Sequence, residues 1–205
     1  EESWVGAVSQ RLRLDGYHGF NDWLSLSLAY NLVARVQDPL LFTLLPVASR
    51  VNAAGYRAAD LDPLLFPRSW DDVRSFAVFQ NLDRLFFTAE APWFDVYVGR
   101  QAVAWGSARA VNPTDVIAPF LYTDLDTENR IGVDAVRMRT PLGALGEVDA
   151  GYIAGEDFKF DQSAFFLRAR TYTAGSDLAG LVVGFREHLM IGADITRAIG
   201  GAGSW

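Results

Sequence analysis

The sequence predicts an all-β fold, an antiparallel transmembrane β-barrel, and three observations support this prediction. The stretch from Trp23 to Val36 alternates leucine-rich and small or polar positions over about 12 residues, which exceeds most globular strands and suffices for a tilted membrane strand. Half of the residues are hydrophobic, yet the longest apolar run, Leu40 to Ala48, is too short for a membrane-spanning helix. Arginines also recur at alternate positions of other predicted strands, which places them on one face.

The composition limits the classes of function. A net charge of −7 disfavours nucleic acid as a partner, because phosphate binding requires a basic surface. The 205 residues suit a single domain, 1–205, and the absence of cysteine fits a cell-envelope protein without disulfides. The chain starts at Glu1 without a basic and apolar leader, so we expect any signal peptide to have been removed or to lie outside this sequence.

The first two strands form a predicted hairpin. Residues Trp4 to Asp15 place arginines and leucines on opposite faces, and a turn from Gly16 to Asp22 leads into the strand from Trp23 to Val36. A strand of a soluble sandwich would show the same alternation. The length of the second strand favours the membrane barrel over this alternative.

Two long connections, residues 37–73 and 107–130, follow. The first contains four prolines and does not alternate, and we expect both to carry short helical turns. Connections of this length are unusual in compact soluble domains but ordinary on the outer side of membrane barrels. Between them the sequence predicts strands from Arg74 to Glu90, with an irregularity near Asp83-Arg84, and from Phe94 to Gly106.

From Gly132 onward, polar and glycine-containing turns separate shorter strands. These strands are predicted at Gly132 to Thr140, Gly146 to Gly155, Ser163 to Ala174, Leu178 to Arg186 and Leu189 to Ile199. With the earlier segments this makes about nine strands, and the final GGAGSW is predicted to be a glycine turn that enters another strand. Bacterial barrels use even strand numbers and close the first strand on the last. We therefore expect the chain to be a fragment of a larger barrel.

The most distinctive string of the sequence is GRQAVAWGSARAVNPTDV, which begins at Gly99. Its first part has the composition of a strand. Its second part predicts a helix start, because Asn112 is suited to the N-cap, Pro113 to the first helical position and Asp115 to the positive end of the helix dipole. A short capped helix is therefore predicted from Asn112 to Pro119.

This string resembles the Gly-Arg-Gln, Trp-Gly and Asn-Pro segment of porin-like outer-membrane β-barrel proteins of Gram-negative bacteria, including the alginate-export type. The similarity is strongest from Tyr97 to Val116 and looser from Gln80 to Gly203. The residues that carry it are Gly99, Arg100, Gln101, Trp105, Gly106, Asn112, Pro113 and Asp115. The resemblance implies an outer-membrane channel or export barrel, and hence a location in the bacterial outer membrane.

Arginines at positions i and i+2 occur on three predicted strands. Because an arginine that faces lipid at mid-membrane costs about 2 to 4 kcal/mol, we expect these pairs to face a polar lumen. The predicted lumen-lining residues are Arg11, Arg13, Arg137, Arg139, Glu147, Asp149, Arg168, Arg170 and Asp194. The residues predicted to face lipid are Leu24, Leu26, Leu28, Leu32, Val148, Ala150, Leu189 and Ile191. The alternative is that the arginines cover the solvated face of a soluble sheet.

The hairpin centred on Gly143 predicts a register. If it is symmetric about this glycine, Arg139 lies opposite Glu147 and Arg137 opposite Asp149, and each pair contributes roughly 0.2 to 1 kcal/mol. These pairs can be structural as well as part of a conduction path. Two other arginines, 168 and 170, have no carboxylate within their own strand, so we expect them to bias passage toward anions.

No catalytic or metal site is predicted. The loop that contains Asp124, Asp126 and Glu128 lacks the glycine and the ligand count of an EF-hand. His18 and His188 are the only histidines, and neither lies in a recognised metal or nucleophile motif. A Ser-His pair of an outer-membrane lipase remains as the enzymatic alternative. We expect a protein that is not an enzyme and needs no cofactor.

The leading prediction is an outer-membrane, porin-like channel. Small hydrophilic or anionic solutes, or an exported polymer, would diffuse passively through its arginine-lined lumen. The expected partners are outer-membrane lipid and the solute, with an envelope protein as a further candidate and no nucleic acid. Two alternatives stay open: a structural barrel that is plugged or that sheathes a partner protein, and a soluble all-β binding protein.

Overall fold

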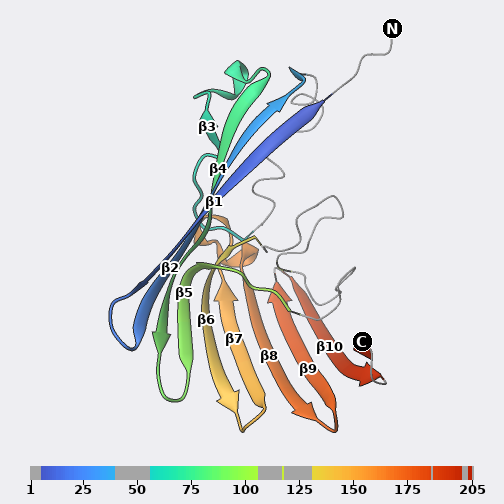
Figure 1. Ribbon diagram of the computed structural model, residues 1–205. Coiled ribbons are helices and arrows are strands. Elements are labelled where there is room, and N and C mark those ends of the chain that lie inside the picture. The colour runs from blue at the N-terminus through green and yellow to red at the C-terminus, as the bar shows by residue number, and fades with distance from the viewer. Residues whose placement is uncertain are drawn as a thin grey trace.

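The computed structural model describes residues 6–39, 56–105, 117, 131–185, 187–199 and 203–204. Within these residues the fold is all-β, as predicted, with almost no helix (Figure 1). The strands are β1 (Ala7–Gly19), β2 (Leu24–Gln37), β3 (Leu64–Phe66), β4 (Phe76–Glu90), β5 (Asp95–Gln101), β6 (Val133–Leu142), β7 (Gly146–Ile153), β8 (Ala164–Thr173), β9 (Ser176–Phe185), β10 (His188–Ile199) and β11 (Gly203–Ser204). Three single-turn 3₁₀ helices are η1 (Trp70–Asp72), η2 (Glu156–Phe158) and η3 (Phe160–Gln162).

The strands form one antiparallel sheet in which each strand pairs mainly with its neighbours in sequence. Its order is β1-β2-β4-β5-β6-β7-β8-β9-β10-β11, and β3 lies off this path and pairs with β4. The sheet is open, because no strand of the described residues pairs with the second edge of β1. Among the described residues there is also no helix long and apolar enough to cross a membrane.

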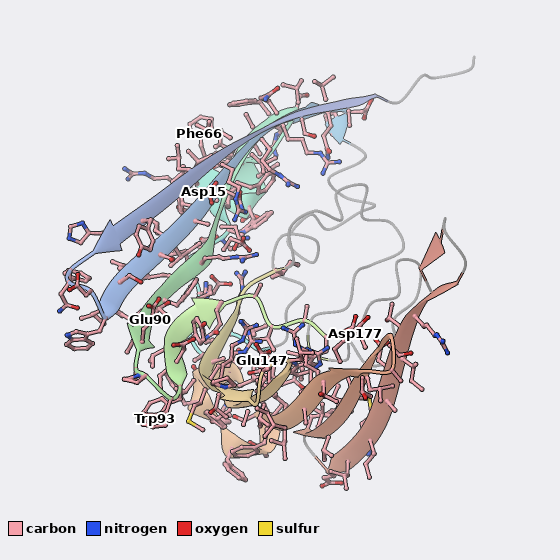
Figure 2. All side chains as sticks on the ribbon, turned by 60° about the horizontal axis from the view of Figure 1, so that its bottom comes forward. Asp15, Phe66, Glu90, Trp93, Glu147 and Asp177 are labelled. Atoms are coloured by element: carbon pink, nitrogen blue, oxygen red, sulfur yellow. The ribbon has the colours of Figure 1, made fainter. Side chains whose placement is uncertain are left out.

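Strand alternation gives the sheet two chemically different faces. On β6, Val136 and Met138 are 48% and 44% exposed, whereas Arg137 between them is only 8% exposed. We call the face with Arg137 the inner face and the opposite one the outer face. Figure 2 shows the sheet curled around the inner face, with Glu147 inside the curl. The cross-strand register keeps each face continuous from β1 to β10.

The outer face is mainly apolar and exposed, except near the gap between β4 and β5, where the register also places Arg100 and Asp134 on this face and Arg100 is buried. Its exposed large apolar residues are Val8, Leu12, Leu14, Leu28, Val36, Phe76, Leu85, Phe87, Val98, Val136, Met138, Leu142, Phe165, Leu167, Val182, Leu189, Ile191 and Ile195. All residues predicted to face lipid lie on this face.

The two ends of the sheet also differ. The short turns at residues 20–23, 91–94, 143–145 and 174–175 lie at one end, the turn end, which is at the bottom of Figure 1. The strands β2, β5, β7 and β9 end at the other, the connection end, where the chain continues toward β3, β6, β8 and β10. The three longest links therefore start at the connection end, where the short link between β9 and β10 also lies.

The predicted strands are all present in the described residues, with shifted ends. The first strand continues to Gly19, so its turn is shorter than the predicted Gly16 to Asp22. The prediction that the central strand reaches Gly106 is wrong, because β5 ends at Gln101 and residues 102–105 leave the sheet. The short β3 and the 3₁₀ helices were not predicted. The predicted helix from Asn112 to Pro119 lies outside the described residues, except for position 117.

The sheet divides at a bulge in β4. The register with β2 shifts between Ala29 and Tyr30, where Asp83 is the extra residue of β4, so the predicted irregularity is confirmed. On its other edge β4 pairs with β5 from Leu85 to Glu90, and beyond the bulge it pairs with β3 instead. The bulge therefore marks the point where β4 separates from β5 and a loop segment enters the gap.

A buried core covers the inner face at the connection end. It contains Tyr56, Val103, Trp105, Ile117, Val133, Ala135, Ile153, Ala164, Phe166, Leu181 and Val183. Most of these side chains belong to the inner-face positions of β6 to β9, and the others come from the connections. The Trp105 and Phe166 rings lie 4.6 Å apart between centroids. Packing of the connections onto the sheet thus buries the inner face at this end.

Candidate functional site

The candidate site is the charged part of the inner face, toward the turn end of β6, β7 and β8. Pairing places Arg139, Asp149 and Arg168 in one row across these strands. The next row toward the turns contains Glu147 opposite Arg170. Four of the predicted lumen-lining arginines and both of the predicted carboxylates of this hairpin are therefore brought together. Figure 2 shows Glu147 in this region of the curl.

Arg137 and Asp149 form the most buried ion pair of the site. Arg137 Nε donates to Asp149 Oδ1 at 2.7 Å, and Arg137 Nη2 donates to Asp149 Oδ2. Asp149 is only 1% exposed. The planar guanidinium therefore occupies both oxygens of this carboxylate, as in a bidentate pair.

The predicted register of this hairpin is wrong. Arg139 lies opposite Asp149, not Glu147, and Arg137 lies opposite Gly151. The turn occupies residues 143–145, so the hairpin is centred on residue 144 and the partner strand is displaced by two positions. A two-residue displacement preserves the faces. The Arg137 side chain consequently reaches Asp149 along a diagonal.

The remaining arginines of the site differ in their contacts. Arg170 Nε lies 3.5 Å from Glu147 Oε1, so this arginine has a carboxylate partner on the neighbouring strand. Arg139 lies over the Tyr97 ring, with 5.6 Å from Cζ to the ring centroid. In the part of the chain that the structure describes, no carboxylate lies within ion-pair distance of Arg139 or Arg168. Asp194 lines the same recess as Arg168, together with Trp105 and Leu181.

The predicted lumen residues of β1 lie on the same face but farther around the sheet. Arg13 Nη1 donates to Asp83 Oδ2 at 2.9 Å, and Arg13 Nε donates to Asp15 Oδ1 at 3.0 Å. The bulge of β4 therefore supplies a buried carboxylate to the β1 arginine across the intervening β2. Arg11 lies two positions away on the same face and is exposed.

The inner face is electrically balanced when all described strands are considered. Its arginines are Arg11, Arg13, Arg35, Arg84, Arg137, Arg139, Arg168 and Arg170. Its carboxylates are Asp15, Asp83, Glu90, Asp95, Glu147, Asp149, Asp177 and Asp194. The two sets are equal in number. Selectivity on this face must therefore come from places where opposite charges do not meet.

The family-motif residues of β5 have structural roles. Gly99 has a φ of +122°, and an added Cβ would lie 2.3 Å from the Leu85 carbonyl oxygen, so only glycine fits there. Gln101 is buried, and its Nε2 donates to the Ala135 carbonyl oxygen at 3.2 Å. Trp105 belongs to the inner core. Motif positions Gly106, Asn112, Pro113 and Asp115 lie outside the described residues.

Arg100 is the centre of a polar junction at the gap between β4 and β5. Its Nε donates to Asp134 Oδ1 and its Nη1 to Asp60 Oδ1, both at 2.8 Å. Arg57, from the same connection as Asp60, donates from Nε to the Gly132 carbonyl oxygen at 3.0 Å and from Nη1 to Asp60 Oδ2 at 2.7 Å. These bonds fasten residues 57–60 to the sheet where β4 and β5 separate.

The sequence did not predict this junction. Its members lie far apart in the chain, and no spacing connects Arg57 and Asp60 with Arg100 or Asp134. The one available signal was the arginine of the Gly-Arg-Gln string, which was assigned to the motif without a partner.

Other predicted candidates do not gather into a site. Within the described ranges, no three metal-ligating side chains come together. His18 lies 4.7 Å from Phe20 and His188 lies 5.8 Å from Phe185 between ring centroids, and neither is hydrogen-bonded to a serine in the described chain. The loop with Asp124, Asp126 and Glu128 lies outside the described residues.

The chain matches no protein-family model, no curated protein and no solved structure. The resemblance of the GRQAVAWGSARAVNPTDV string to porin-like proteins therefore stays a prediction. Any function has to be argued from the two faces of the sheet and the charged site.

Proposed function

We propose that this chain forms part of the wall of an outer-membrane β-barrel channel that passes small hydrophilic solutes by diffusion, including anions. The observation that carries the proposal is the inversion of the usual burial pattern, in which an exposed outer face is apolar and a sheltered inner face is charged. Barrel strands in membranes alternate in this way, with apolar residues toward lipid and polar residues toward the lumen. The channel would be neither an enzyme nor dependent on a cofactor.

The outer face is difficult to reconcile with water as its only surroundings. On β10, Leu189 and Ile191 are 69% and 74% exposed, and apolar neighbours continue the surface around the sheet. Monomeric soluble proteins rarely expose contiguous apolar patches larger than a few hundred Å². Contact with lipid acyl chains would remove this surface from water, at a gain of roughly 25 cal/mol per Å². This supports the proposal of a membrane protein over that of a soluble binding protein.

Aromatic residues at both ends of the strands support the same proposal. Phe20, Trp23 and Trp93 are exposed at the turn end, and Phe158 and Phe160 are exposed at the connection end. Aromatic girdles at both interfaces flank the apolar band of membrane barrels. Most long strands also meet the roughly 9 to 11 residues that a tilted crossing requires; β6, β8 and β9 have 10 each.

A barrel further requires that the sheet close. The second edge of β1, a strand of 13 residues, has no partner strand in the described residues. Lipid does not tolerate such an edge, because no water is present to satisfy it. We propose that a further strand pairs with β1 and completes the wall.

A plugged barrel is the second candidate, and one observation favours it. Val103, Trp105 and Ile117 come from the β5–β6 connection and pack on the inner face. Residues of this connection that pack inside the curl occupy space through which a solute would otherwise pass. The charged part of the inner face, toward the turns, lies beyond these contacts.

Reconstitution tests the proposal. The chain is expected to need detergent for solubility, to show heat-modifiable gel mobility, and to produce discrete conductance steps in planar bilayers. Detergent dependence without conductance would replace the open channel with the plugged barrel. A monodisperse, detergent-free protein would overturn both and leave a soluble β protein.

A further inference from the structure

We propose that Arg139 and Arg168 form a two-point binding site for an elongated organic dianion on the inner face. The inference rests on the proposed function, in which this face is accessible to solutes, and names the solute class. It differs from the sequence-based expectation, in which Arg168 acts together with Arg170.

The site depends on which arginine forms hydrogen bonds with Asp149. Asp149 lies between Arg139 and Arg168 in one cross-strand row, and it would be the natural partner of both. Both of its oxygens already accept hydrogen bonds from Arg137. The diagonal Arg137–Asp149 pair therefore leaves two guanidiniums on either side of it without a carboxylate contact in the described chain.

The surroundings of the two arginines confirm that their hydrogen-bonding capacity is not used by the described chain. Arg139 Nε is buried and has no hydrogen-bond partner there. Its neighbour across β5, Asp95, lies opposite in the register but not within ion-pair distance. Arg168 has Asp194 and Asp149 nearby, yet neither forms an ion pair with it among the described contacts. A buried donor without a partner is costly, so an acceptor from a ligand would be stabilising.

Other arginines of the fold do not offer the same opportunity. Arg170 is next to Glu147, Arg13 is held by Asp83 and Asp15, and Arg100 is held by Asp134 and Asp60. A ligand anion would have to compete with a carboxylate at each of these positions. Arg139 and Arg168 therefore differ from these three arginines, each of which has a carboxylate partner.

The geometry selects the ligand class. The two arginines are two strands apart in the same row, so their backbones are separated by roughly 10 Å. Arg139 leans toward Tyr97, and Arg168 lines the recess with Trp105 and Leu181, so the two side chains point away from each other. A short anion reaches one guanidinium only. A longer dianion can reach both, because its chain spans the distance across β7 between the two arginines.

The test is calorimetric titration of the full chain in detergent with succinate, suberate and dodecanedioate. Suberate or dodecanedioate is expected to bind at least about tenfold more tightly than succinate. Arg139→Gln and Arg168→Gln should each weaken binding of the longer acids about tenfold or more, because each loses a charge-assisted hydrogen bond. Arg170→Gln should change affinity less than about threefold, and Lys159→Gln should leave it unchanged.

Equal losses from Arg168→Gln and Arg170→Gln, or no preference for longer acids, would overturn the two-point site. If a glutamine variant does not fold, Arg168→Lys replaces it; lysine keeps the charge but loses the planar fork, and reduced affinity is again expected. Binding in detergent does not require conduction. A channel that conducts but binds no diacid contradicts this inference alone, whereas binding without conductance contradicts the proposed channel alone.

Discussion

The two halves of the inner face are buried by different kinds of contact. At the connection end, Val133, Ile153 and Val183 are fully buried beneath Trp105 and other residues of the connections. At the turn end, Arg137 and Asp149 are buried with each other, and no apolar cluster of the described residues covers them. The comparison teaches that the apolar half is specified by packing, whereas the charged half depends on which arginine each carboxylate pairs with. A substitution in the charged half should therefore be compensated by replacing the partner charge, whereas a truncation in the apolar half should not be.

The largest effect on stability is expected in the charged half from Asp149→Ala. Removal of this carboxylate leaves Arg137 buried without its partner, which should destabilise the fold by about 4 kcal/mol. Equilibrium unfolding in detergent with urea would measure the loss. The double variant Arg137→Met with Asp149→Leu should recover most of it, because no uncompensated charge remains. If the double variant is as unstable as the single one, the ion pair is not the reason.

In the apolar half, Trp105→Ala should destabilise the protein by about 3 kcal/mol through lost contacts with Phe166 and the surrounding core. The same variant also tests the hypothesis that the barrel is plugged. Loosening of the connection that carries Trp105 should raise single-channel conductance if this connection narrows the path. Trp93→Ala is the matched control, since Trp93 is 77% exposed at the turn end and should alter neither measurement strongly.

A smaller effect, on selectivity, is expected from glutamates in the charged half. The double variant Arg168→Glu with Arg170→Glu adds four negative charge units, and the reversal potential under a salt gradient should shift toward cations. Of the single variants, Arg168→Glu should produce the larger shift, because Arg170 is already opposed by Glu147. A larger shift from Arg170→Glu would reverse this order and show that the ion pair does not offset its charge.

The smallest effect is expected outside both halves, at Lys159. Lys159 Nζ lies 3.5 Å from Asp157 Oδ2, and both side chains are largely exposed. Lys159→Glu should change the free energy of unfolding by less than about 0.5 kcal/mol and leave the reversal potential nearly unchanged. A shift as large as that of Arg168→Glu would mean that loop charges set selectivity.

Local alternation explains what the sequence could predict. A period of two assigns faces without any knowledge of partners, so Leu189 and Asp194 were placed on opposite faces, as the register has them. The bulge near Asp83 was predictable because the alternation is interrupted there. Whether these faces meet lipid and a lumen stays a prediction.

What the sequence could not predict depends on contacts between distant residues or on turn geometry. The hairpin register was wrong because the turn is centred on Ala144 and not on Gly143, and no strand pattern reveals this difference. The end of β5 was wrong because Val103 and Trp105 are as suited to a packed core as to a strand. The junction of Arg57 with Arg100 joins a connection to a strand, so its members carry no common spacing.

The second edge of β1, which no described strand covers, has a consequence for how the chain would be handled if it is delivered to a membrane as proposed. A 13-residue strand whose second edge has no partner strand among the described residues, and whose apolar face is exposed, is a template for pairing with an extended chain. In water, copies of this protein would add to one another and aggregate. If the proposed function is correct, a carrier that holds β1 apart from other strands until its neighbour is available would prevent this pairing.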